Sequence, residues 1–515
     1  MVAERSGRSS LVVVSNRLPV RLHHDAESHT WEATQGGGGL VQALEPMLRQ
    51  RGGGWVGWPN VVENAPPGWQ TKLEEAGRAR GMAFHPIQLT EADVREFYGG
   101  FSNEVLWPLF HGLDDRAVFH PDYFGAFDRV NAKFAEAAFA AAAERDLIWV
   151  HDFQLIAVAQ HLRQLGYTGQ IAFFLHIPFP SLDGFLKLPW RGQVLSALLD
   201  YDLVGFQTER DRRNFLDCVE RLLPDASFHV KDEPEALTEV FSNDRKTMVG
   251  TFPIGIDHKK VVSVAKSEAV EKRTLQHRVQ LNGRAVLLGV DRLDYTKGIH
   301  ERLLAFERLL SENPGLSEEV LFIQVVQPSR TTVDEYKELK RDIDRLVGDI
   351  NGRYGTPGWA PIHYLYRSID WTELFALYRV ARVAVITPLK DGMNLVAKEY
   401  CACQIDEPGT LVLSEFAGAA AQLHHHAIIT NPYDVEGTAH ALRAALSSPL
   451  DERRLRVEAL NEQVRREDVF WWTRRFLRAV GGGEVDYVAE YLPELEYDSR
   501  SSASGTVEAA ELKTE

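Results

Sequence analysis

The stretch TPLKDGMNLVAKEYCACQ, residues 387–404, follows an apolar run and leads into a segment with helix-forming composition. The backbone N–H groups at the predicted start of this helix belong to Gly392, Met393, Asn394 and Leu395. N–H groups at a helix start lack partners within the helix and bind anions such as the oxygens of a diphosphate. Asp391 is placed to accept hydrogen bonds from sugar hydroxyls, and two neighbouring ribose hydroxyls would satisfy the carboxylate of Glu399. The residues alone leave alternatives open: Asp391 as a helix cap, and Glu399 paired with Lys398 or facing water.

A second segment, GVDRLDYTKGIHERLLAF at residues 289–306, places two cations beside another predicted helix start. Arg292 and Lys297 follow an apolar, strand-like run, and a glycine begins the helical pattern. A planar guanidinium, a compact ammonium group and the N–H groups of a helix can together grip a diphosphate. The alternative on these residues alone is a pair of surface ion pairs with Asp291 and Asp294.

Other polar side chains come directly after apolar runs that have the composition of buried strands. They are Arg17, His151 with Asp152, His176, and Arg330. The carboxyl ends of parallel strands lie at one edge of a sheet, where ligands bind in open α/β folds. We therefore expect these side chains to converge on one cleft between two domains.

Short apolar runs rich in β-branched residues alternate with longer helical patterns along most of the chain. The runs include residues 11–16, 147–152, 171–178, 285–291, 320–326 and 382–389. Strands that are apolar on both faces are buried between two layers of helices. The pattern therefore predicts an α/β protein with doubly wound parallel sheets.

One break in this pattern suggests where two domains meet. The segment TFPIGID carries a Pro and a Gly after a polar stretch, and a new series of strands and helices follows it. We expect an N-terminal Rossmann-like domain at residues 1–251 and a C-terminal one at 252–468. A helix at 469–483 is predicted to return to the N-terminal domain. Residues 484–515 are acidic and rich in Ser and Gly, and are predicted to be a disordered tail.

The composition limits the partners of the protein. Its 515 residues include 57 Lys and Arg against 73 Asp and Glu, which gives a formal net charge of −16. This charge argues against general binding to nucleic acids or to anionic membranes, so an anionic ligand must be held by a few focused cations. The 3 cysteines are too few for a disulfide framework, and no apolar segment near the N-terminus is long enough for a signal peptide. We expect a soluble, cytoplasmic protein.

Three other features have ordinary explanations beside functional ones. The glycines of GGGGL, residues 36–40, could let the backbone approach an anion, and a flexible turn explains them equally well. Aromatic side chains cluster in WVGW and in FYGGFSNEVLWPLFH. Their rings can stack on a sugar, although core packing is the commoner role of any one ring. Successive histidines at 424–426 point in different directions and lack metal-ligand spacing, so no metal site is predicted there.

Taken together, these motifs make the sequence resemble the trehalose-6-phosphate synthases, which are retaining glycosyltransferases of the two-domain GT-B fold. The resemblance covers roughly Leu11 to Val480. The motifs that carry it are VVSNRLP, FSNEVLWPLFH, WVHDFQL, FLHIPFPS, DYDLVGFQTERDRRNFLDC, GVDRLDYTKG and TPLKDGMNLVAKEY.

The resemblance implies a role for each matching position. On the donor side, the diphosphate would be held by Gly39, Arg292, Lys297 and the helix start formed by Gly392, Met393, Asn394 and Leu395. Glu399 would hold the ribose, and Asp391 and His176 the transferred glucose. On the acceptor side, Arg17 and Arg330 would bind the phosphate of glucose 6-phosphate, Trp58, Tyr98 and Trp107 would line its pocket, and Asp152 would contact the sugar. The implied catalytic set is Asp152, His176, Arg292, Lys297 and Asp391.

The resemblance also implies the reaction. Glucose would pass from a nucleotide-glucose (UDP-, GDP- or ADP-glucose) to glucose 6-phosphate, giving α,α-trehalose 6-phosphate with retention at the donor carbon. No protein nucleophile, metal or cofactor is implied, because the leaving diphosphate serves as the base and the cations around it stabilise its charge. The nucleotide base and the formation of a homo-oligomer stay open. Two alternatives stay open as well: a related transferase with another phosphorylated acceptor such as glycerol 3-phosphate, and a non-catalytic sugar-phosphate sensor.

Overall fold

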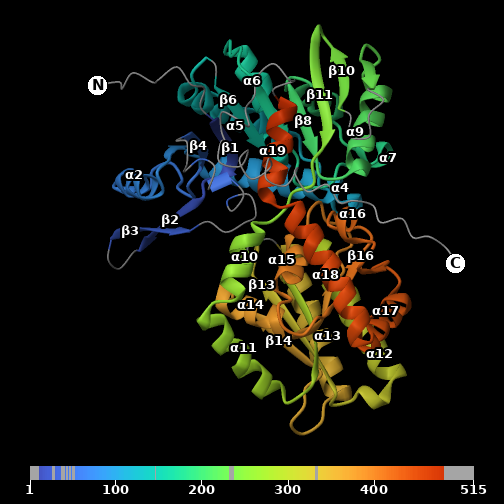
Figure 1. The fold of residues 1–515 in the computed structure, drawn as a ribbon. Coiled ribbons are helices and arrows are strands. Elements are labelled where there is room, and N and C mark those ends of the chain that lie inside the picture. The colour runs from blue at the N-terminus through green and yellow to red at the C-terminus, as the bar shows by residue number, and fades with distance from the viewer. Residues whose placement is uncertain are drawn as a thin grey trace, which may run out of the picture.

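The computed structural model describes residues 11–25, 29–35, 41, 44, 45, 48, 53–144, 146–230, 237–330 and 334–480. These residues form two lobes, drawn one above the other in Figure 1. The N-terminal lobe contains strands β1 to β11 and the last helix, and the C-terminal lobe contains the elements from α10 to α18. The predicted glycine loop at 36–40, with Gly39, and the predicted tail at 484–515 lie outside the described residues.

In the described part of the chain, the N-terminal lobe is built on a nine-stranded sheet of order β5-β4-β1-β6-β7-β8-β11-β10-β9. The strands are β1 (Leu11–Arg17), β4 (Gly53–Trp58), β5 (Ala83–Pro86), β6 (Leu147–His151), β7 (Ile171–Phe174), β8 (Leu203–Phe206), β9 (Ser227–Val230), β10 (Thr238–Ser242) and β11 (Arg245–Thr251). Pairing is parallel from β5 to β11 and antiparallel for β9 and β10. A two-residue turn joins β10 to β11, and Asn243 and Asp244 take the positive φ angles that such a hairpin turn requires.

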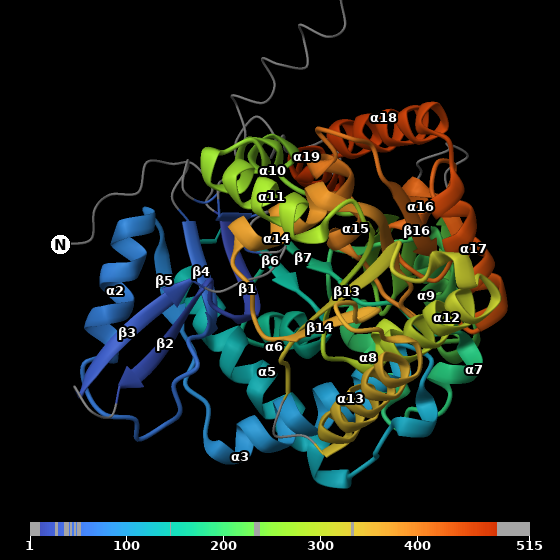
Figure 2. The ribbon, with the colours of Figure 1, turned by 90° about the horizontal axis from the view of Figure 1, so that it is seen from below.

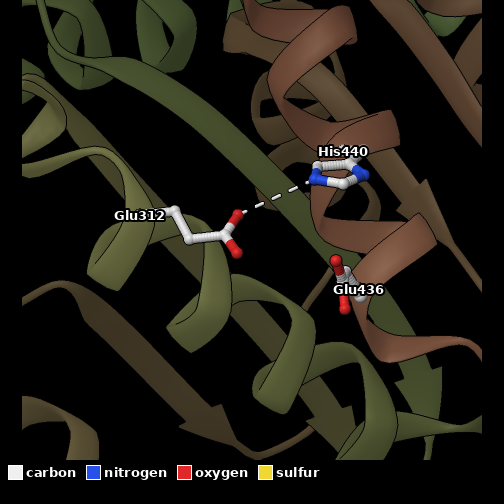
Figure 3. Close-up of side chains that lie close together, drawn as sticks. All are labelled: Glu312, Glu436 and His440. Carbon is white, nitrogen blue, oxygen red and sulfur yellow. Dashed lines mark ion pairs between the residues drawn. The ribbon is translucent and has the colours of Figure 1, made fainter.

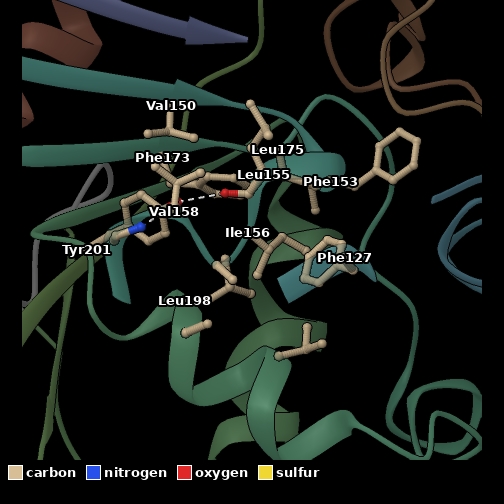
Figure 4. Close-up of a cluster of buried hydrophobic side chains, with 14 of the residues drawn as sticks. Phe127, Val150, Phe153, Leu155, Ile156, Val158, Phe173, Leu175, Leu198 and Tyr201 are labelled. Carbon is tan, nitrogen blue, oxygen red and sulfur yellow. Dashed lines mark hydrogen bonds between the residues drawn. The ribbon is translucent and has the colours of Figure 1, made fainter. Parts of the chain in front are cut away.

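The sheet is covered on both faces because side chains alternate along each buried strand. In β1, Val12 and Val14 pack in the core shared with α5 (Pro121–Ala141), α6 (Val158–Gln164), α8 (Arg191–Leu198) and α9 (Glu209–Leu222). Leu11 and Val13 face the opposite core, with α2 (Trp69–Arg80) and α19 (Val469–Val480). Figure 4 shows part of the first core, where the buried hydroxyl of Tyr201 donates to the carbonyl oxygen of Leu155 over 2.9 Å.

The last described helix, α19, packs on the N-terminal sheet (red in Figure 1). The ring of Phe476 stacks on that of Trp149 at 4.4 Å between centroids. The chain therefore crosses between the lobes twice, before α10 (His258–Ala265) and again before α19. The two crossings touch at Gly255, where a Cβ atom would lie 2.4 Å from the carbonyl oxygen of Glu467, so only glycine fits there.

The C-terminal lobe is built on a sheet of order β14-β13-β12-β15-β16-β17, in which every pairing is parallel. The strands are β12 (Ala285–Arg292), β13 (Val320–Gln327), β14 (Ile362–Tyr366), β15 (Ala381–Ile386), β16 (Thr410–Ser414) and β17 (Ile428–Thr430). One face carries α10 (His258–Ala265), α11 (Glu268–Leu281), α14 (Trp371–Val380), α15 (Leu395–Cys403) and α18 (Leu450–Arg466). The other face carries α12 (Ile299–Glu312), α13 (Asp334–Tyr354) and α17 (Val435–Ser447).

Strands β2 (Val20–Asp25) and β3 (Thr30–Gln35) form an antiparallel hairpin that projects beside α2 (Figure 2). The three cysteines are free and buried, which agrees with the expectation that they form no disulfide framework. Among the described helices, none is both long and apolar enough to cross a membrane.

Candidate functional site

The carboxyl edges of the two sheets face each other, and the sequence predicts a site at this place. The loop that follows β15 packs directly on the loop that follows β7. Nδ1 of His176 lies 3.4 Å from Sδ of Met393. A Cβ atom on Gly392 would lie 2.4 Å from the carbonyl oxygen of His176, so a glycine is required for the two backbones to come this close.

Arg17, at the end of β1, is held mainly by aromatic rings. Its guanidinium carbon lies 4.4 Å from the ring centroid of Trp58 and 5.1 Å from that of Tyr98. Its Nη1 donates to the side-chain oxygen of Asn60 over 2.7 Å. The neighbouring Trp55 is fully buried and donates to Ser15, so Trp58 is the tryptophan of this pair that contacts Arg17. The guanidinium is thus held over rings that leave most of its donors available.

Tyr98 and Trp107 are positioned by an unusual helix. Tyr98 lies within a π-helix, Val94–Leu106, and Trp107 begins α4 (Trp107–Phe110) directly after it. The two residues are nine positions apart, which in a regular α-helix is about two and a half turns and would put the rings on opposite faces. The π-helix bonds each residue to a more distant one, so each turn holds more residues. As a result both rings face one group of arginines, formed by Arg17, Arg292 and Arg330.

Arg330 reaches this group from the C-terminal lobe. Its guanidinium carbon lies 4.4 Å from the ring centroid of Trp107, and its Nη1 lies 3.6 Å from a carboxylate oxygen of Asp294. It also donates to the hydroxyl of Tyr336. Burial alone would lower the pKa of Arg330, but Tyr336 and Asp294 outweigh it and raise that pKa. Its φ of 47° is a backbone conformation that non-glycine residues rarely adopt and that often marks functional sites.

The pKa of Tyr98 indicates that three arginines lie close to its hydroxyl. Burial would raise the pKa of its hydroxyl, but the positive charges of Arg17, Arg330 and Arg292 lower it below the ordinary value. Arg292 is exposed at the end of β12, with its guanidinium carbon 5.9 Å from the Trp107 centroid. Three cations from two lobes therefore surround one pair of aromatic rings.

Asp152 follows β6 with φ 76° and ψ 164°, a strained backbone for an aspartate. Its Oδ1 accepts from the backbone N–H of His176 over 3.2 Å. Burial raises the pKa of Asp152 to about 6, against the lowering effect of that bond, of the Phe153 N–H and of Arg292. An acid with a raised pKa beside a cluster of cations is typical of functional sites.

The loop that holds Asp391 is organised by this side chain. Oδ2 accepts from Nζ of Lys297 over 2.6 Å and from Nδ2 of Asn394 over 3.2 Å. Oδ1 accepts from the N–H of Met393 over 3.3 Å. Burial would raise the pKa of Asp391, and Lys297 brings it below its ordinary value. The capping role belongs to Asn394 and not to Asp391, because Oδ1 of Asn394 accepts from the N–H of Ala397 in the first turn of α15.

The alternative of surface ion pairs for Arg292 and Lys297 is wrong. Asp291 pairs instead with Arg302, Asp294 with Arg330, and Lys297 with Asp391. Among the described residues, no carboxylate lies within ion-pair distance of Arg292.

Glu399 is held by a tyrosine. Its Oε2 accepts from the hydroxyl of Tyr378 over 3.1 Å. Burial raises its pKa to about 7. The expected alternative of a pair with Lys398 is wrong, because the ammonium group of Lys398 donates to the carbonyl oxygen of Ile254 and to Gln422. Glu399 is thus a partly exposed acid with unused acceptor capacity.

Sequence reasoning missed the residues that support these loops. Arg302, fully buried on α12, donates to Thr387, to Gln324 and to the carbonyl oxygen of Lys297. It thereby ties the loop after β12 to the loop after β15. His111 was also missed; burial lowers its pKa to about 4, and its Nδ1 contacts the carbonyl oxygen of Trp107. An arginine in the middle of an amphipathic helix gives no signal in a sequence, because it usually faces solvent.

Two other groups of polar residues lie elsewhere. Glu312, Glu436 and His440 come close enough to share a cation, but all are exposed, and the single ion pair between Glu312 and His440 spans 3.8 Å (Figure 3). Exposed acidic groups of this kind are common without an ion, so we assign no metal there. A cavity of about 420 Å³ lies at the amino ends of β7, β8 and β11, lined by Arg163, Gly166, Tyr167, Thr168, Asp202 and Arg245. It is at the opposite edge of the sheet from Asp152 and His176.

Comparison with known proteins gives one consistent result. The profile of glycosyltransferase family 20 matches residues 9–481. A trehalose-6-phosphate synthase of Mycolicibacterium vanbaalenii is 44% identical over 483 residues, which are 93% of this chain and 97% of that protein. A trehalose-6-phosphate synthase of Mycolicibacterium smegmatis is 42% identical over 506 residues, 96% of this chain and 98% of that protein.

Solved structures agree with the sequences. An alpha,alpha-trehalose-phosphate synthase (UDP-forming) from Burkholderia xenovorans, in complex with glucose-6-phosphate, superposes with a TM-score of 0.81 at 35% identity, covering 92% of this chain and 100% of that chain. A structure from E. coli, bound with UDP-2-fluoro glucose, has a TM-score of 0.79 at 35% identity and covers 92% and 99%. The predicted GT-B architecture of two Rossmann-like lobes is confirmed.

Proposed function

Because the chain belongs to glycosyltransferase family 20, we propose that it transfers glucose from a nucleotide-glucose to glucose 6-phosphate, forming α,α-trehalose 6-phosphate with retention at the donor carbon. The prediction of an enzyme of trehalose 6-phosphate synthesis is confirmed by the family match and by the relatives. The observation that carries the proposal is the convergence of Arg17, Arg330 and Arg292 around Tyr98 and Trp107 at the meeting edge of the lobes.

Glucose 6-phosphate binds at the carboxyl edge of the sheet of the N-terminal lobe. Arg17 and Arg330 hold its phosphate from the two lobes, since a guanidinium bonds phosphate through two parallel N–H donors. Trp58, Tyr98 and Trp107 form the wall behind the two arginines, and Asp152 accepts from a hydroxyl of the acceptor sugar. The Burkholderia xenovorans relative bound to glucose-6-phosphate supports this class of acceptor.

The nucleotide-glucose binds at the carboxyl edge of the sheet of the C-terminal lobe. Arg292, Lys297 and the N–H groups near Gly392 to Leu395 hold the diphosphate, while Gly39 is assigned to it from its motif alone. Glu399 holds the ribose, because two vicinal hydroxyls would fill the acceptor capacity that Tyr378 leaves. Asp391 and His176 contact the transferred glucose. The E. coli relative bound with UDP-2-fluoro glucose supports a nucleotide-glucose donor.

These residues perform the transfer by orientation and charge. Departure of the nucleoside diphosphate leaves positive charge on the donor carbon and negative charge on the leaving oxygen, which Arg292, Lys297 and the helix N-terminus stabilise. The acceptor hydroxyl attacks from the same face, and its proton passes to the departing diphosphate. This assigns the catalytic set Asp152, His176, Arg292, Lys297 and Asp391 to positioning and electrostatics, with no protein nucleophile. We propose that neither a metal nor a cofactor is required, since the protein itself supplies the positive charge.

We divide the chain into an N-terminal domain at 1–251 that binds the acceptor, a C-terminal domain at 252–468 that binds the donor, and a returning helix at 469–483. We place the protein in the cytoplasm. The donor base and the oligomeric state are questions for experiment.

One experiment tests the proposal. The purified chain is incubated with glucose 6-phosphate and UDP-, GDP- or ADP-glucose in turn, with EDTA present, and the products are separated and identified by mass and by NMR. We expect trehalose 6-phosphate with at least one donor and an α configuration at both anomeric carbons. No trehalose 6-phosphate with any donor would refute the proposed function, and a product formed from glycerol 3-phosphate instead would point to the related transferase.

A further inference from the structure

Two buried histidines stand in line at the meeting edge of the lobes, and only one of them has been assigned a role. His151 ends β6, and His176 follows the adjacent strand β7. Nδ1 of His151 lies 3.2 Å from Nε2 of His176, and Nδ1 of His176 lies 3.4 Å from Sδ of Met393. Nε2 of His151 is buried, and the described residues offer it no hydrogen-bond partner. These contacts therefore form a line that begins at the unpaired Nε2 of His151 inside the N-terminal lobe and ends at Met393, in the loop after β15 of the C-terminal lobe.

A neutral imidazole carries one proton, so the line can be protonated in two consistent ways. In the first, Nδ1–H of His151 donates to Nε2 of His176, and Nδ1–H of His176 points to the sulfur of Met393. In the second, Nε2–H of His176 donates to His151, and the proton of His151 must then lie on its Nε2.

The two arrangements differ in how many buried donors have acceptors. In the first, both N–H groups face an acceptor, although a thioether sulfur is a weak one. In the second, the N–H of His151 is buried without an acceptor, and a lone pair of His176 faces a lone pair of sulfur. An unpaired buried donor is strongly unfavourable, whereas an acceptor without a donor is tolerated more often. The geometry therefore favours the first arrangement.

The surroundings keep both rings neutral. Burial lowers the pKa of His176 to about 3 and lowers that of His151 well below its ordinary value. The rings of Trp149 and Phe174 lie 4.8 Å from those of His151 and His176, respectively. The contact between the two histidines can therefore determine which nitrogen of each ring carries the proton, but not the charge of the rings.

We propose that His151 is a positioning residue that holds His176 in the tautomer with its proton on Nδ1, so that this N–H donates to a hydroxyl oxygen of the transferred glucose in place of the Met393 sulfur. This inference rests on the proposed function for its second half, the contact with sugar. A weak acceptor such as sulfur is easily replaced by a hydroxyl oxygen, which bonds an N–H more strongly. The tautomer itself can be measured without any substrate.

The first test is spectroscopic. The full-length protein is labelled with ¹⁵N-histidine, and long-range ¹H–¹⁵N correlations are recorded at neutral pH, with the His176 signals identified by their loss in His176→Asn. We expect His176 to carry its proton on Nδ1 in the wild type and in His151→Asn, whose side-chain N–H takes the place of Nδ1–H. In His151→Phe we expect the Nε2–H form of His176 to increase. A wild-type His176 protonated on Nε2 would overturn the proposal whatever the enzyme does.

The second test is kinetic. We expect His151→Phe to lower kcat about tenfold, the loss of one oriented hydrogen bond, while the KM for glucose 6-phosphate stays within about twofold. His151→Asn should recover most of that loss, and His151→Phe should have little further effect when His176→Ala is already present. Equal losses in the Phe and Asn variants, or additive losses in the double variant, would show a structural role and refute the proposal. A wild-type chain that forms no trehalose 6-phosphate would refute the proposed function and leave the tautomer measurement intact.

Discussion

The nine-stranded sheet has arginines at both of its edges, but the two edges satisfy them differently. At the amino edge, Arg163 donates to the carbonyl oxygens of Tyr167 and Gly169 over 2.9 and 2.8 Å and pairs with Asp202 at 2.7 Å. Asp202 in turn accepts from the N–H of Ile171 over 2.7 Å. At the carboxyl edge, Arg17 lies over two aromatic rings and has only neutral acceptors, Asn60 and the hydroxyl of Tyr98, and among the described residues no carboxylate is paired with it.

This difference separates a structural charge from a binding charge. The two terminal nitrogens of the amino-edge arginine are filled by carbonyl oxygens of the loop before β7 and by a carboxylate, so an added ligand would have to displace these partners. Its Nε is buried without a hydrogen-bond partner among the described residues. The carboxyl-edge arginine is desolvated on its faces, while its donors keep room for an anion. The cavity of about 420 Å³ at the amino edge is therefore lined by residues of a structural network. The pairing of the terminal guanidinium nitrogens with protein acceptors is what distinguishes Arg163 from Arg17.

The largest expected effect comes from Arg17→Met at the carboxyl edge. Losing two charge-assisted bonds to phosphate should lower kcat/KM for glucose 6-phosphate roughly a thousandfold. The free energy of unfolding should change by less than about 1 kcal/mol, because methionine keeps the stem that packs between the rings. Steady-state kinetics with varied acceptor and urea unfolding measure both. A loss of less than tenfold would mean that Arg17 does not hold the phosphate.

The matched variant at the amino edge, Arg163→Met, should reverse this pattern. It removes three hydrogen bonds and leaves Asp202 with a less complete set of donors, so the free energy of unfolding should fall by about 3 kcal/mol. The kcat/KM per folded molecule should stay within about twofold of the wild type. If Arg163→Met lost activity without losing stability, the distinction between the two edges would be wrong.

The positions of the site residues could be predicted from the sequence, but their partners could not. Strand-end residues such as His176 and Arg330 were located correctly, because apolar runs identify parallel strands and parallel strands share an edge. The partners of those residues were not predictable. The alternative that Asp294 pairs with a cation nearby in the chain is wrong, because Asp294 meets Arg330 across the neighbouring strands β12 and β13.

Two further features depended on three-dimensional packing. The π-helix of Val94–Leu106 has no simple sequence pattern, so the shared orientation of Tyr98 and Trp107 could not be foreseen. Lys398 lies within the motif, directly before Glu399, yet its side chain turns to the crossing between the lobes at Ile254 and leaves Glu399 to Tyr378. Neighbours in sequence on a helix point in different directions, and tertiary contacts decide their partners.

A third prediction concerns the acid at the carboxyl edge. The pKa of Asp152 rises from 3.8 to about 6 on folding, so between these values the native state binds more protons than the unfolded state. Raising the pH across this window should lower the free energy of unfolding of the wild type, relative to Asp152→Asn, by up to about 3 kcal/mol and have no further effect above it. Urea unfolding of both proteins at pH 4 and pH 7.5, roughly the two sides of this window, measures the difference. A difference that does not change with pH would show that burial leaves this carboxyl unperturbed.

The smallest expected effect concerns an exposed ion pair, and it tests whether good geometry alone makes an ion pair contribute to the free energy of unfolding. Arg465 on α18 forms two short bonds to Glu462, at 2.7 and 2.6 Å, so its geometry is at least as good as that of Arg163 with Asp202. Both side chains are mostly exposed, at 61% and 58% of their accessible area, against 15% and 23% for the amino-edge pair. Water competes for exposed charges, so Arg465→Gln should change the free energy of unfolding by no more than about 0.5 kcal/mol and leave kcat/KM unaltered. A loss as large as that of Arg163→Met would mean that burial and completed pairing do not decide the role of an arginine in this protein.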